Sequence, residues 1–497
     1  MLSPRGTHSS SGDTDWGFTL VVSLLGLLPR LFVAIAWSRE PVWDGHYYHF
    51  GATRIAEGLG YSEDLIVGGQ TVWKAWCHYP VGYSAFLGGL YVIFGRGLLV
   101  APIANAVIGA LQILVAHRLG RQFLSSDRAR IGAGLVALHP GLIAYTAVVM
   151  NELLSALLLT TAAWAMSALR RRPLRGGSVG GVILGLATLV RPSLLLAAPL
   201  SALIYGKHKL KALAAGLVCL GVCVLCVLPW SARNCARMDG CAFVSTNGGW
   251  NLAIGALTTT GRFQTLKSQD GCPVVSGQVQ QDRCWADVGR KAIRADPKRW
   301  LGMIPKKLGH TYDHESFAIE YLREANPAAW PEDRRVAGRA LLSTFHRALL
   351  VLAAFAVVGL PLAPRRRREE VASPQAETPA QAEHAARARS NVTIAWVCQA
   401  MLATLIAGTA GYAILNTEHP FFWLPTLLPL LAMLRLPGSP RHFGAGRYLL
   451  ALLFSTTLIH AVFFGDDRYH LLVTPVLCLF AAAAFRRSAA PGSATVG

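Results

Sequence analysis

The loop from Arg39 to Tyr83 holds the carboxylate that is best suited to chemistry in this sequence. Asp44 lies four residues after Glu40 and follows the first long apolar run closely. A carboxylate just beyond a membrane span is costly unless it faces water or a partner. We therefore interpret Asp44 as a candidate general base. The alternative is that Asp44 only caps the helix that follows it.

Other polar side chains occur in segments that are expected on the same membrane face as Asp44. Each has a structural alternative, because an acid can cap a helix and a basic side chain can extend to the interface. These candidates are Lys74, His78, Glu152, Arg191, Arg233, Asn247 with Gly248 and Gly249, His419, and the run Asp466–His470.

Acids and bases on one membrane face suit a lipid-linked anionic substrate, such as a polyprenyl phosphate that carries a sugar. A phosphate monoester has a second pKa of about 6, so it can depart near neutral pH without a general acid. One carboxylate then suffices to take the proton of an acceptor hydroxyl, while arginine and lysine hold the phosphate. Attack opposite the leaving group inverts the sugar configuration. Backbone amides around Gly248 and Gly249 could add an anion-binding nest.

No metal or other cofactor is expected. The adjacent acids Asp466 and Asp467 point in different directions and have no obvious third ligand. A histidine pair at i, i+4 spacing lies close to two acids, but the glutamate placement of a zinc protease is missing, so metal binding there is the minority interpretation. These four residues are His310, Asp313, His314 and Glu315.

The composition indicates a protein that crosses a membrane many times. Of its 497 residues, 53% are hydrophobic and only 15% are charged, whereas a soluble protein carries about 25% charged residues. The net charge is +20, and the basic residues cluster in short loops between apolar runs, as in cytoplasmic membrane loops. No zinc-finger spacing or nucleic-acid fold signature occurs, so no nucleic-acid partner is expected.

Apolar runs and loop charges together predict an all-α polytopic fold with about twelve transmembrane helices and both termini in the cytoplasm. The first run is too long for a signal-peptide core and is expected to be retained. The expected spans are Phe18–Trp37, Leu98–Ala116, Ile131–Val149, Leu153–Leu169, two short helices within Gly180–Tyr205 that meet near Arg191, Leu213–Leu228, Leu341–Leu360, Val392–Ala410, Phe421–Leu434, Tyr448–Phe464 and Leu471–Phe485.

Two outer regions are expected to carry the site. The first outer loop, 38–97, is predicted to hold helices that lie along the interface over Tyr47–Leu59 and Pro80–Phe94. By parity, the hydrophilic insert 231–340 also lies outside. The expected order is a cytoplasmic N-terminus 1–17, a transmembrane module 18–230, the insert 231–340, a second module 341–487 with a Pro/Ala/Glu-rich cytoplasmic linker 361–391, and a tail 488–497.

The cysteines of the outer regions offer a check on topology. Cys235 with Cys241, and Cys272 with Cys284, could form disulfides in an oxidising compartment, although free thiols are the alternative. Cys77 is expected outside as well, where a membrane-impermeant thiol reagent should reach it.

Several stretches, taken in order, carry a family resemblance. They are Trp43–Tyr48, Tyr79–Phe86 with Phe94-Gly95, Asn151-Glu152 with Gly185–Pro192, Pro229-Trp230 with Arg233-Asn234 and Ser245–Leu252, and Arg468–His470. The set resembles the polytopic sugar transferases of the GT-C class, above all glycosyltransferase family 39 with the protein O-mannosyltransferases and the lipid A aminoarabinose transferase. Val81 departs from this pattern, since it replaces the usual second proline of the juxtamembrane motif.

The resemblance implies a GT-C-type fold and an inverting membrane glycosyltransferase. Its donor would be a polyprenyl-phosphate sugar, and its acceptor a cell-envelope glycan, lipid or protein. It would work among the lipids of the plasma (inner) membrane, with its active site on the extracytoplasmic face. Asp44 would be the base and Glu152 would help to shape the site. Phosphate ligands would be Arg191, Arg468 and His470, with Lys74 and Arg233; substrate contacts would be Tyr47, His78, Tyr79, Asn247, Gly248 and Tyr469.

The alternative from another functional class is a flippase or transporter of lipid-linked sugars. Such a protein should show internal repeats and polar residues in mid-span, and it would not need a long outer insert. Here the ionisable groups gather at one membrane face, which favours the enzyme.

Overall fold

The computed structural model describes residues 10–206, 209–273, 277–358, 422–432 and 444–485, with a few more between 397 and 412. Within these ranges the protein is almost entirely helical, which confirms the expected all-α class. The expected linker 361–391, most of the span Val392–Ala410, His419 and the tail 488–497 lie outside the described residues.

The first outer loop consists of two helices and a hairpin that follow helix α1 (Ser10–Ala36). Helix α2 covers Asp44–Ala56, strands β1 and β2 cover Ser62–Val67 and Gln70–Ala75, and helix α3 covers Val81–Phe94. The helices were predicted, whereas the hairpin was not. Its turn is Gly68-Gly69, with φ values of 59° and 83°, and two residues with positive φ are what a two-residue hairpin turn requires.

The first membrane module continues with α4 (Val100–Gly120), α5 (Ser126–Leu138), α6 (Pro140–Ala144), the short 3-10 helix η1 (Tyr145–Ala147) and α7 (Glu152–Ala168). It then forms α8 (Pro173–Val190), η2 (Pro192–Leu196), α9 (Ala197–Leu200), η3 (Ser201–Tyr205) and α10 (Lys209–Arg237). The chain turns at Arg191 between α8 and η2, where the sequence predicted the tip of a helical hairpin.

The insert and the last module are helical too. The insert holds α11 (Gly248–Leu257), η4 (Ser268–Asp270), α12 (Gln278–Ala295), α13 (Pro297–Gly302), α14 (Ile304–Tyr312), α15 (Phe317–Ala325) and η5 (Pro327–Ala329). After it come α16 (Glu332–Val358), α19 (Trp423–Ala432), α20 (Gly444–Val462), η6 (Asp467–Leu472) and α21 (Thr474–Ala483).

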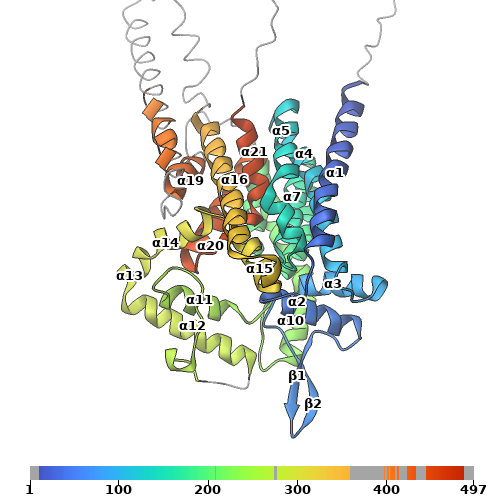
Figure 1. Cartoon of the computed structure of the whole chain (residues 1–497), viewed down its shortest axis with the longest axis vertical. Helices are drawn as coiled ribbons and strands as arrows, with labels where there is room; N and C mark the ends of the chain where they lie inside the picture. The colour runs from blue at the N-terminus through green and yellow to red at the C-terminus, as the bar shows by residue number, and fades with distance from the viewer. Residues whose placement is uncertain are drawn as a thin grey trace, which may run out of the picture.

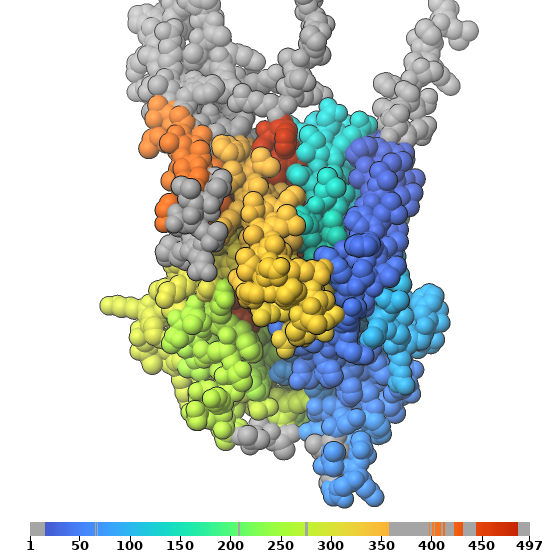
Figure 2. Space-filling view, viewed as in Figure 1, coloured from blue at the N-terminus to red at the C-terminus, as the bar shows by residue number. Residues whose placement is uncertain are grey.

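Long helices run side by side, and the polar elements gather at one end of them. Figure 1 shows α2, α3, the β1–β2 hairpin, α11, α12 and α13 at this end, while α1 begins and α21 ends at the other. The start of α1 and the end of α21 thus lie at the same end of the molecule (Figure 1), which agrees with an even number of membrane crossings. In the space-filling view, the surface is hollowed between the green insert and the yellow segment of α15 and α16 (Figure 2).

Among the described residues, six helices are long and apolar enough to cross a membrane, in keeping with a multi-pass membrane protein. They include Asp15–Ala36, Val100–Gly120, Pro173–Val190, Lys209–Arg237, Glu332–Ala356 and Gly444–Val462. Shorter apolar helices are Val81–Phe94, Glu152–Ala168, Pro192–Tyr205 and Thr474–Ala483. The count of twelve crossings stays a prediction.

The expected third span, Ile131–Val149, is not one helix. Helix α5 ends at Leu138 and α6 begins at Pro140, with His139 between them at φ −65° and ψ 113°. A proline has no N–H and pushes the residue before it into extended backbone, which explains the break.

Both expected ends of the insert fall inside helices. Helix α10 does not stop at Pro229-Trp230 but continues to Arg237, and α16 begins at Glu332, before the expected boundary at 340/341. Tertiary contacts hold the extension of α10, because the side chains of Trp230 and Asn234 both donate hydrogen bonds to the carbonyl of Val244.

Candidate active site

Asp44 lies in the first turn of α2 and accepts hydrogen bonds on both carboxylate oxygens. Oδ1 accepts from the Tyr79 hydroxyl at 2.7 Å, and Oδ2 accepts from Nη1 of Arg468 at 2.6 Å. Asp44 and Arg468 are 424 positions apart in the sequence. The Asp44 side chain remains 25% exposed, so a substrate can reach it.

The backbone around Asp44 is fixed by its two neighbours. Trp43 has a φ of 52°, the only positive value for a non-glycine residue in the described part of the chain, and its ring packs on Phe317 and Tyr321. A Cβ on Gly45 would lie 2.8 Å from the carbonyl oxygen of Val149. Strain of this kind persists only where the surrounding structure holds it, and it often marks functional sites.

The electrostatics of Asp44 favour the ionised form. Burial alone would raise the pKa of Asp44, but the Arg468 guanidinium and the Tyr79 hydroxyl outweigh it, so the pKa lies below the ordinary value of 3.8. Asp44 is therefore a carboxylate at neutral pH, as a general base must be.

A second ion pair lies beside the first. Nη1 of Arg191 is 3.3 Å from Oε1 of Glu152, whose side chain is only 2% exposed. The ring of Tyr469 connects the two pairs, since the guanidinium carbons of Arg191 and Arg468 lie 5.1 Å and 5.0 Å from its centroid. Five predicted site residues from distant parts of the chain thus meet: Asp44, Glu152, Arg191, Arg468 and Tyr469.

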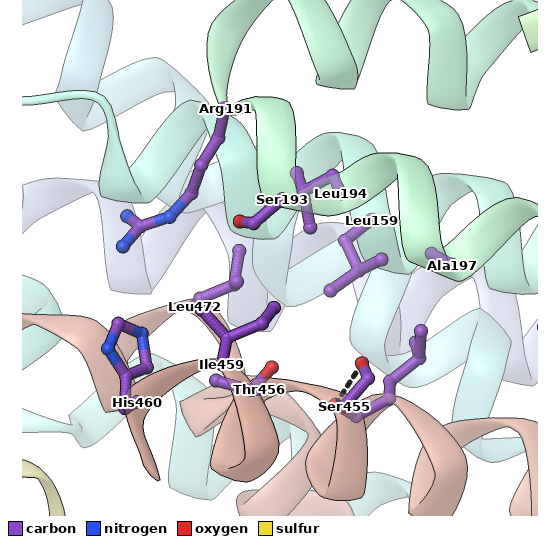
Figure 3. A pocket seen from close by; sticks show the side chains of 11 residues that line it. Leu159, Arg191, Ser193, Leu194, Ala197, Ser455, Thr456, Ile459, His460 and Leu472 are labelled. Carbon is purple, nitrogen blue, oxygen red and sulfur yellow. Dashed lines mark hydrogen bonds between the residues drawn. The ribbon is translucent and has the colours of Figure 1, made fainter. Parts of the chain in front are cut away.

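A narrow, mostly apolar pocket opens next to Arg191. Figure 3 shows the guanidinium of Arg191 and the ring of His460 at one end of it, with Leu159, Ile459 and Leu472 along its walls. The pocket joins η2 and α7 to α20, so it extends from the charged groups into the helical core.

Aromatic side chains form the other wall around Asp44. The ring of Tyr47 stacks on Tyr79 at a centroid distance of 5.3 Å, and Trp250 of α11 contacts His78 edge-on. Burial lowers the pKa of His78 to about 4, so its imidazole is neutral at pH 7. His78 can therefore donate or accept a hydrogen bond there without carrying charge.

The predicted residues at the start of α11 lie near His78 but are partly occupied. Asn247 precedes the helix and accepts a hydrogen bond from the Ser245 hydroxyl, and Gly248 is exposed. The Gly249 amide already donates to Oδ1 of Asp282 at 2.7 Å, which leaves less of the expected anion nest available.

Three predicted phosphate ligands are placed elsewhere. Arg233 donates to the carbonyl oxygens of Tyr61 and Trp76, so it braces the first loop. Lys74 lies on β2 opposite Glu63, in the hairpin that projects beyond α2 (Figure 1). His470 is fully buried, and its Nδ1 lies 2.6 Å from the carbonyl oxygen of Thr311. Their placement does not fit the expectation that they hold the same phosphate as Arg468.

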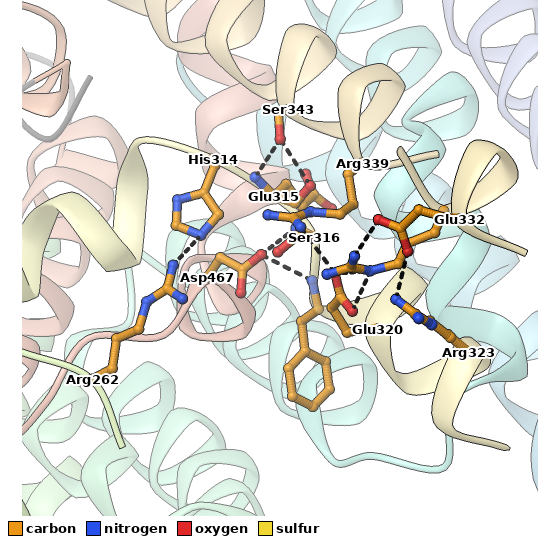
Figure 4. A network of polar contacts seen from close by, with 12 residues as sticks. Arg262, His314, Glu315, Ser316, Glu320, Arg323, Glu332, Arg339, Ser343 and Asp467 are labelled. Atoms are coloured by element: carbon orange, nitrogen blue, oxygen red, sulfur yellow. Dashed lines mark hydrogen bonds and ion pairs between the residues drawn. The ribbon is translucent and has the colours of Figure 1, made fainter. Parts of the chain in front are cut away.

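The acidic pair before Arg468 has a local role. Oδ1 of Asp466 accepts a hydrogen bond from the Arg468 amide at the start of η6. Asp467 accepts from the amides of Ser316 and Phe317 and so caps α15 (Figure 4). The different directions of these two carboxylates were predicted.

The i, i+4 histidines of the insert also have partners. Nε of Arg262 donates to Nδ1 of His310 at 2.9 Å, and Nη2 of Arg262 lies 3.3 Å from Nε2 of His314. Figure 4 shows the contact with His314. Arg262 occupies the ring nitrogens that a metal would need.

Three residues of the site were not predicted as such: Tyr48, Asn151 and His460. Asn151 donates to the Tyr48 hydroxyl at 2.7 Å, and Arg191 donates to Asn151. The ring of His460 stacks on Tyr469 at 4.1 Å. Helical periodicity could have found Tyr48, which follows Asp44 by four residues on the same face of α2; His460 has no comparable sequence signal.

The sequence left open whether two cysteine pairs are bonded, and the structure has both disulfides, Cys235–Cys241 and Cys272–Cys284. Cys77, by contrast, is fully buried, and burial raises the pKa of its thiol to about 11. Because the thiolate is the reactive form, Cys77 is unsuited to labelling from outside, contrary to the expectation from sequence.

The comparison with protein families finds a relative for part of the chain. Residues 78–232 match the model of the family described as dolichyl-phosphate-mannose-protein mannosyltransferase. The match includes Tyr79, Glu152 and Arg191, whereas Asp44 and Arg468 lie outside it. It confirms the resemblance to membrane glycosyltransferases of the GT-C class over less than half of the chain. No curated protein matches the chain.

Solved structures with a similar course of the chain include the following two. The chain is similar to the oligosaccharyltransferase of Archaeoglobus fulgidus tethered with an acceptor peptide, with 13% identity, a TM-score of 0.44, and coverage of 94% of this chain and 49% of that one. It is also similar to ArnT from Cupriavidus metallidurans bound to undecaprenyl phosphate, with 17% identity, a TM-score of 0.33, and coverage of 91% and 77%. The chain therefore spans about half the length of the oligosaccharyltransferase.

Proposed function

We propose that this membrane protein is an inverting glycosyltransferase that moves one sugar from a polyprenyl-phosphate donor to an acceptor. The family match supports glycosyl transfer in general. The observation that carries the proposal is the Asp44 carboxylate, partly exposed and held between the Tyr79 hydroxyl and the Arg468 guanidinium. Asp44 supplies a base, and Arg468 supplies a cation for the leaving phosphate at hydrogen-bond distance from that base.

The proposed reaction forms one bond and breaks one. The acceptor oxygen or nitrogen attacks the anomeric carbon from the face opposite the phosphate, while Asp44 takes the proton of the acceptor. The bond from the anomeric carbon to the phosphate oxygen breaks, and the electron pair leaves with the polyprenyl phosphate. Arg468 and Arg191 stabilise the negative charge on that phosphate.

The ion pairs of the two arginines are compatible with binding of a donor phosphate. Arg468 is paired with Asp44 and Arg191 with Glu152 in the absence of a ligand. A donor phosphate between Arg468 and Arg191 would accept hydrogen bonds from both guanidinium groups. The ion pair between Arg468 and Asp44 would then weaken. The pKa of Asp44 would then rise, so donor binding would strengthen the base.

The first isoprene units of the donor would enter the helical core at the pocket beside Arg191. Leucine, isoleucine and alanine make up six of its eleven lining residues, and the others include Ser193, Thr456 and His460 (Figure 3). Without a ligand the pocket has room for about one water molecule, so its walls must move apart to admit the lipid, with the phosphate at the charged end.

The disulfides support a site on the extracytoplasmic face of the plasma (inner) membrane. Disulfides persist in oxidising compartments and are rare in the cytosol. Both disulfides belong to the same end of the molecule as α11 and α12, which is also the end of α2 and α3. An acceptor on that side would be an envelope glycan, a lipid or a protein.

The test uses the purified full chain in lipid nanodiscs with a panel of polyprenyl-phosphate sugars and lipid, glycan and peptide acceptors. Asp44→Asn should lower transfer by about a hundredfold to ten-thousandfold, the range for loss of a general base, while donor binding is retained. Glu40→Gln is the matched control, because Glu40 is an exposed acid four residues earlier in the same loop, and it should transfer normally.

Full transfer by Asp44→Asn would refute the role of this carboxylate. Donor that crosses the bilayer of a proteoliposome with its sugar still attached, and no transfer to any acceptor, would favour the flippase instead.

A further inference from the structure

We propose that Glu315, His346 and His470 form a buried binding site for one divalent transition-metal ion, with zinc as the preferred metal. The site is separate from the proposed transfer chemistry. Each of the three side chains offers one ligand atom, and these atoms lie within 4.8 Å of one another.

The three side chains come from elements that are distant in sequence. Glu315 lies between α14 and α15, His346 lies on α16, and His470 lies in η6. They are 1%, 0% and 0% exposed. The rings of His346 and His470 lie nearly parallel, with centroids 3.9 Å apart.

Hydrogen bonds to backbone carbonyls decide where the two imidazole protons are. Nε2 of His346 lies 2.9 Å from the carbonyl oxygen of Tyr312, and Nδ1 of His470 lies 2.6 Å from that of Thr311. A carbonyl oxygen only accepts, so these nitrogens carry the protons. The lone pairs are then on Nδ1 of His346 and Nε2 of His470. Carbonyl partners of this kind orient metal-binding histidines.

The atoms that face each other make no hydrogen bond, although Nε2 of His470 lies 3.7 Å from Oε2 of Glu315. Both oxygens of Glu315, Nδ1 of His346 and Nε2 of His470 are buried without a hydrogen-bond partner in the described part of the chain. Burying a carboxylate without a compensating charge is costly. One proton between Glu315 and His470 would satisfy those two groups and leave His346 unpaired, whereas a metal ion satisfies all three.

The donor set selects the metal. Neutral imidazoles suit zinc and its first-row neighbours, and calcium or magnesium would require more oxygen ligands. Ligand atoms of tetrahedral zinc lie about 3.4 Å apart, so the side chains must approach one another by about 1 Å. The stacked rings of His346 and His470 must also turn, because an imidazole nitrogen binds a metal in the plane of its ring. The remaining coordination position can hold a second oxygen of Glu315 or a water molecule.

A third histidine, His139, lies behind Glu315. The Leu142 amide donates to Nδ1 of His139, which leaves the proton on Nε2, and this nitrogen lies 4.0 Å from Oε2 of Glu315. Gly141 lies so close that a Cβ there would collide with the Glu315 carboxylate. The Ser343 hydroxyl of α16 holds the backbone of Glu315 from the other side (Figure 4).

The metal would clamp the segment that carries Arg468. His470 follows Arg468 by two residues in η6, and Asp467, the residue before Arg468, caps α15. Binding of His470 to the same ion as His346 and Glu315 would tie η6 to α16 and to the α14–α15 junction. The inferred role is therefore to position the phosphate-binding arginine.

The experiment measures metal in the purified full chain, prepared from cells grown with zinc and without a polyhistidine tag. Elemental mass spectrometry of the wild-type protein should find about one zinc ion per chain. His346→Ala and Glu315→Gln should reduce it more than tenfold. His117→Ala is the matched control. His117 of α4 is also 0% exposed, but its partner is Thr19 of α1. The His117→Ala variant should therefore keep its zinc.

Removal of zinc by a strong chelator should lower the thermal unfolding midpoint of the wild type, and added zinc should restore it. If a variant does not fold, the zinc content and the unfolding midpoint of the wild type still test the proposal. Cobalt added to the stripped protein should give the visible absorption of a tetrahedral site at one ion per chain. A wild type that carries no zinc and binds neither ion would overturn the proposal, whatever its transfer activity.

Discussion

The ion pair of Asp44 with Arg468 combines two requirements that conflict. A base must be ionised, which a nearby guanidinium favours, but a strongly stabilised carboxylate is a weak base. The pKa of Asp44 lies below 3.8 because Arg468 and Tyr79 together outweigh burial. Base strength at this site therefore depends on what else Arg468 binds. A substrate phosphate is the ligand that the proposed reaction provides.

The pH dependence of transfer tests this balance. A base with a lowered pKa is ionised at every pH above that value, so protonation of Asp44 should not reduce transfer between about pH 5 and 8. A break near neutral pH is expected from Asp466, since burial raises its pKa to about 7. Rates measured across this range should lose the break in Asp466→Asn. At low donor concentration, where the rate reports the donor-free enzyme, a loss of rate centred between pH 5 and 7 that persists in Asp466→Asn would contradict the ionised state of Asp44.

At the scale of elements, close backbone contacts decide how the site is assembled. Helix α3 starts just after Tyr79, and its Gly82 packs on the end of α8, where Arg191 begins the turn. A Cβ on Gly82 would lie 2.5 Å from the backbone nitrogen of Val190. Backbone atoms cannot rotate away as a side chain can, so this contact sets the distance between the Tyr79 and Arg191 segments.

Gly82→Ala should therefore push α3 away from α8. Overpacking of this kind costs about 1–3 kcal/mol, and the thermal unfolding midpoint and the transfer rate should both fall. Gly89→Ala is the control on the same helix, because a Cβ there meets no atom within 4 Å. Equal midpoints and rates for the two variants would show that the α3–α8 contact does not position the site.

In the whole molecule, two sets of polar groups lie at opposite ends of the long helices. Asp15 near the start of α1 pairs with Arg121 and Arg130 around the α4–α5 connection. The hairpin, the disulfides and the proposed active site lie at the opposite end (Figure 1). The orientation rule for basic loops therefore predicts that the proposed active site lies outside the cytoplasm.

Thiol labelling of intact cells tests this orientation. In a Cys77→Ser background, Thr71→Cys in the exposed β2 strand should react with a membrane-impermeant maleimide. Asp127→Cys, exposed in α5 at the other end, should react only after the membrane is permeabilised. The reverse pattern would place the Asp44 site in the cytoplasm.

Local sequence patterns predicted the helical class, the apolar segments and most of the residues that meet at the site. Apolar length and loop charge are local quantities, so they can be read without knowing contacts. Such patterns predicted the turn at Arg191 and two interfacial helices, over Tyr47–Leu59 and Pro80–Phe94, which the structure has over Asp44–Ala56 and Val81–Phe94. For the disulfides, they indicated which cysteines could pair but left open whether the bonds form.

Which side chains come into contact follows from the tertiary structure alone. Arg468 pairs with Asp44, while His470, two residues later, turns to Glu315 and His346. In the tight 3-10 turn of η6, neighbouring residues face different directions, and their partners come from helices hundreds of residues away. No spacing rule along the chain relates such residues, because packing between distant helices brings them together.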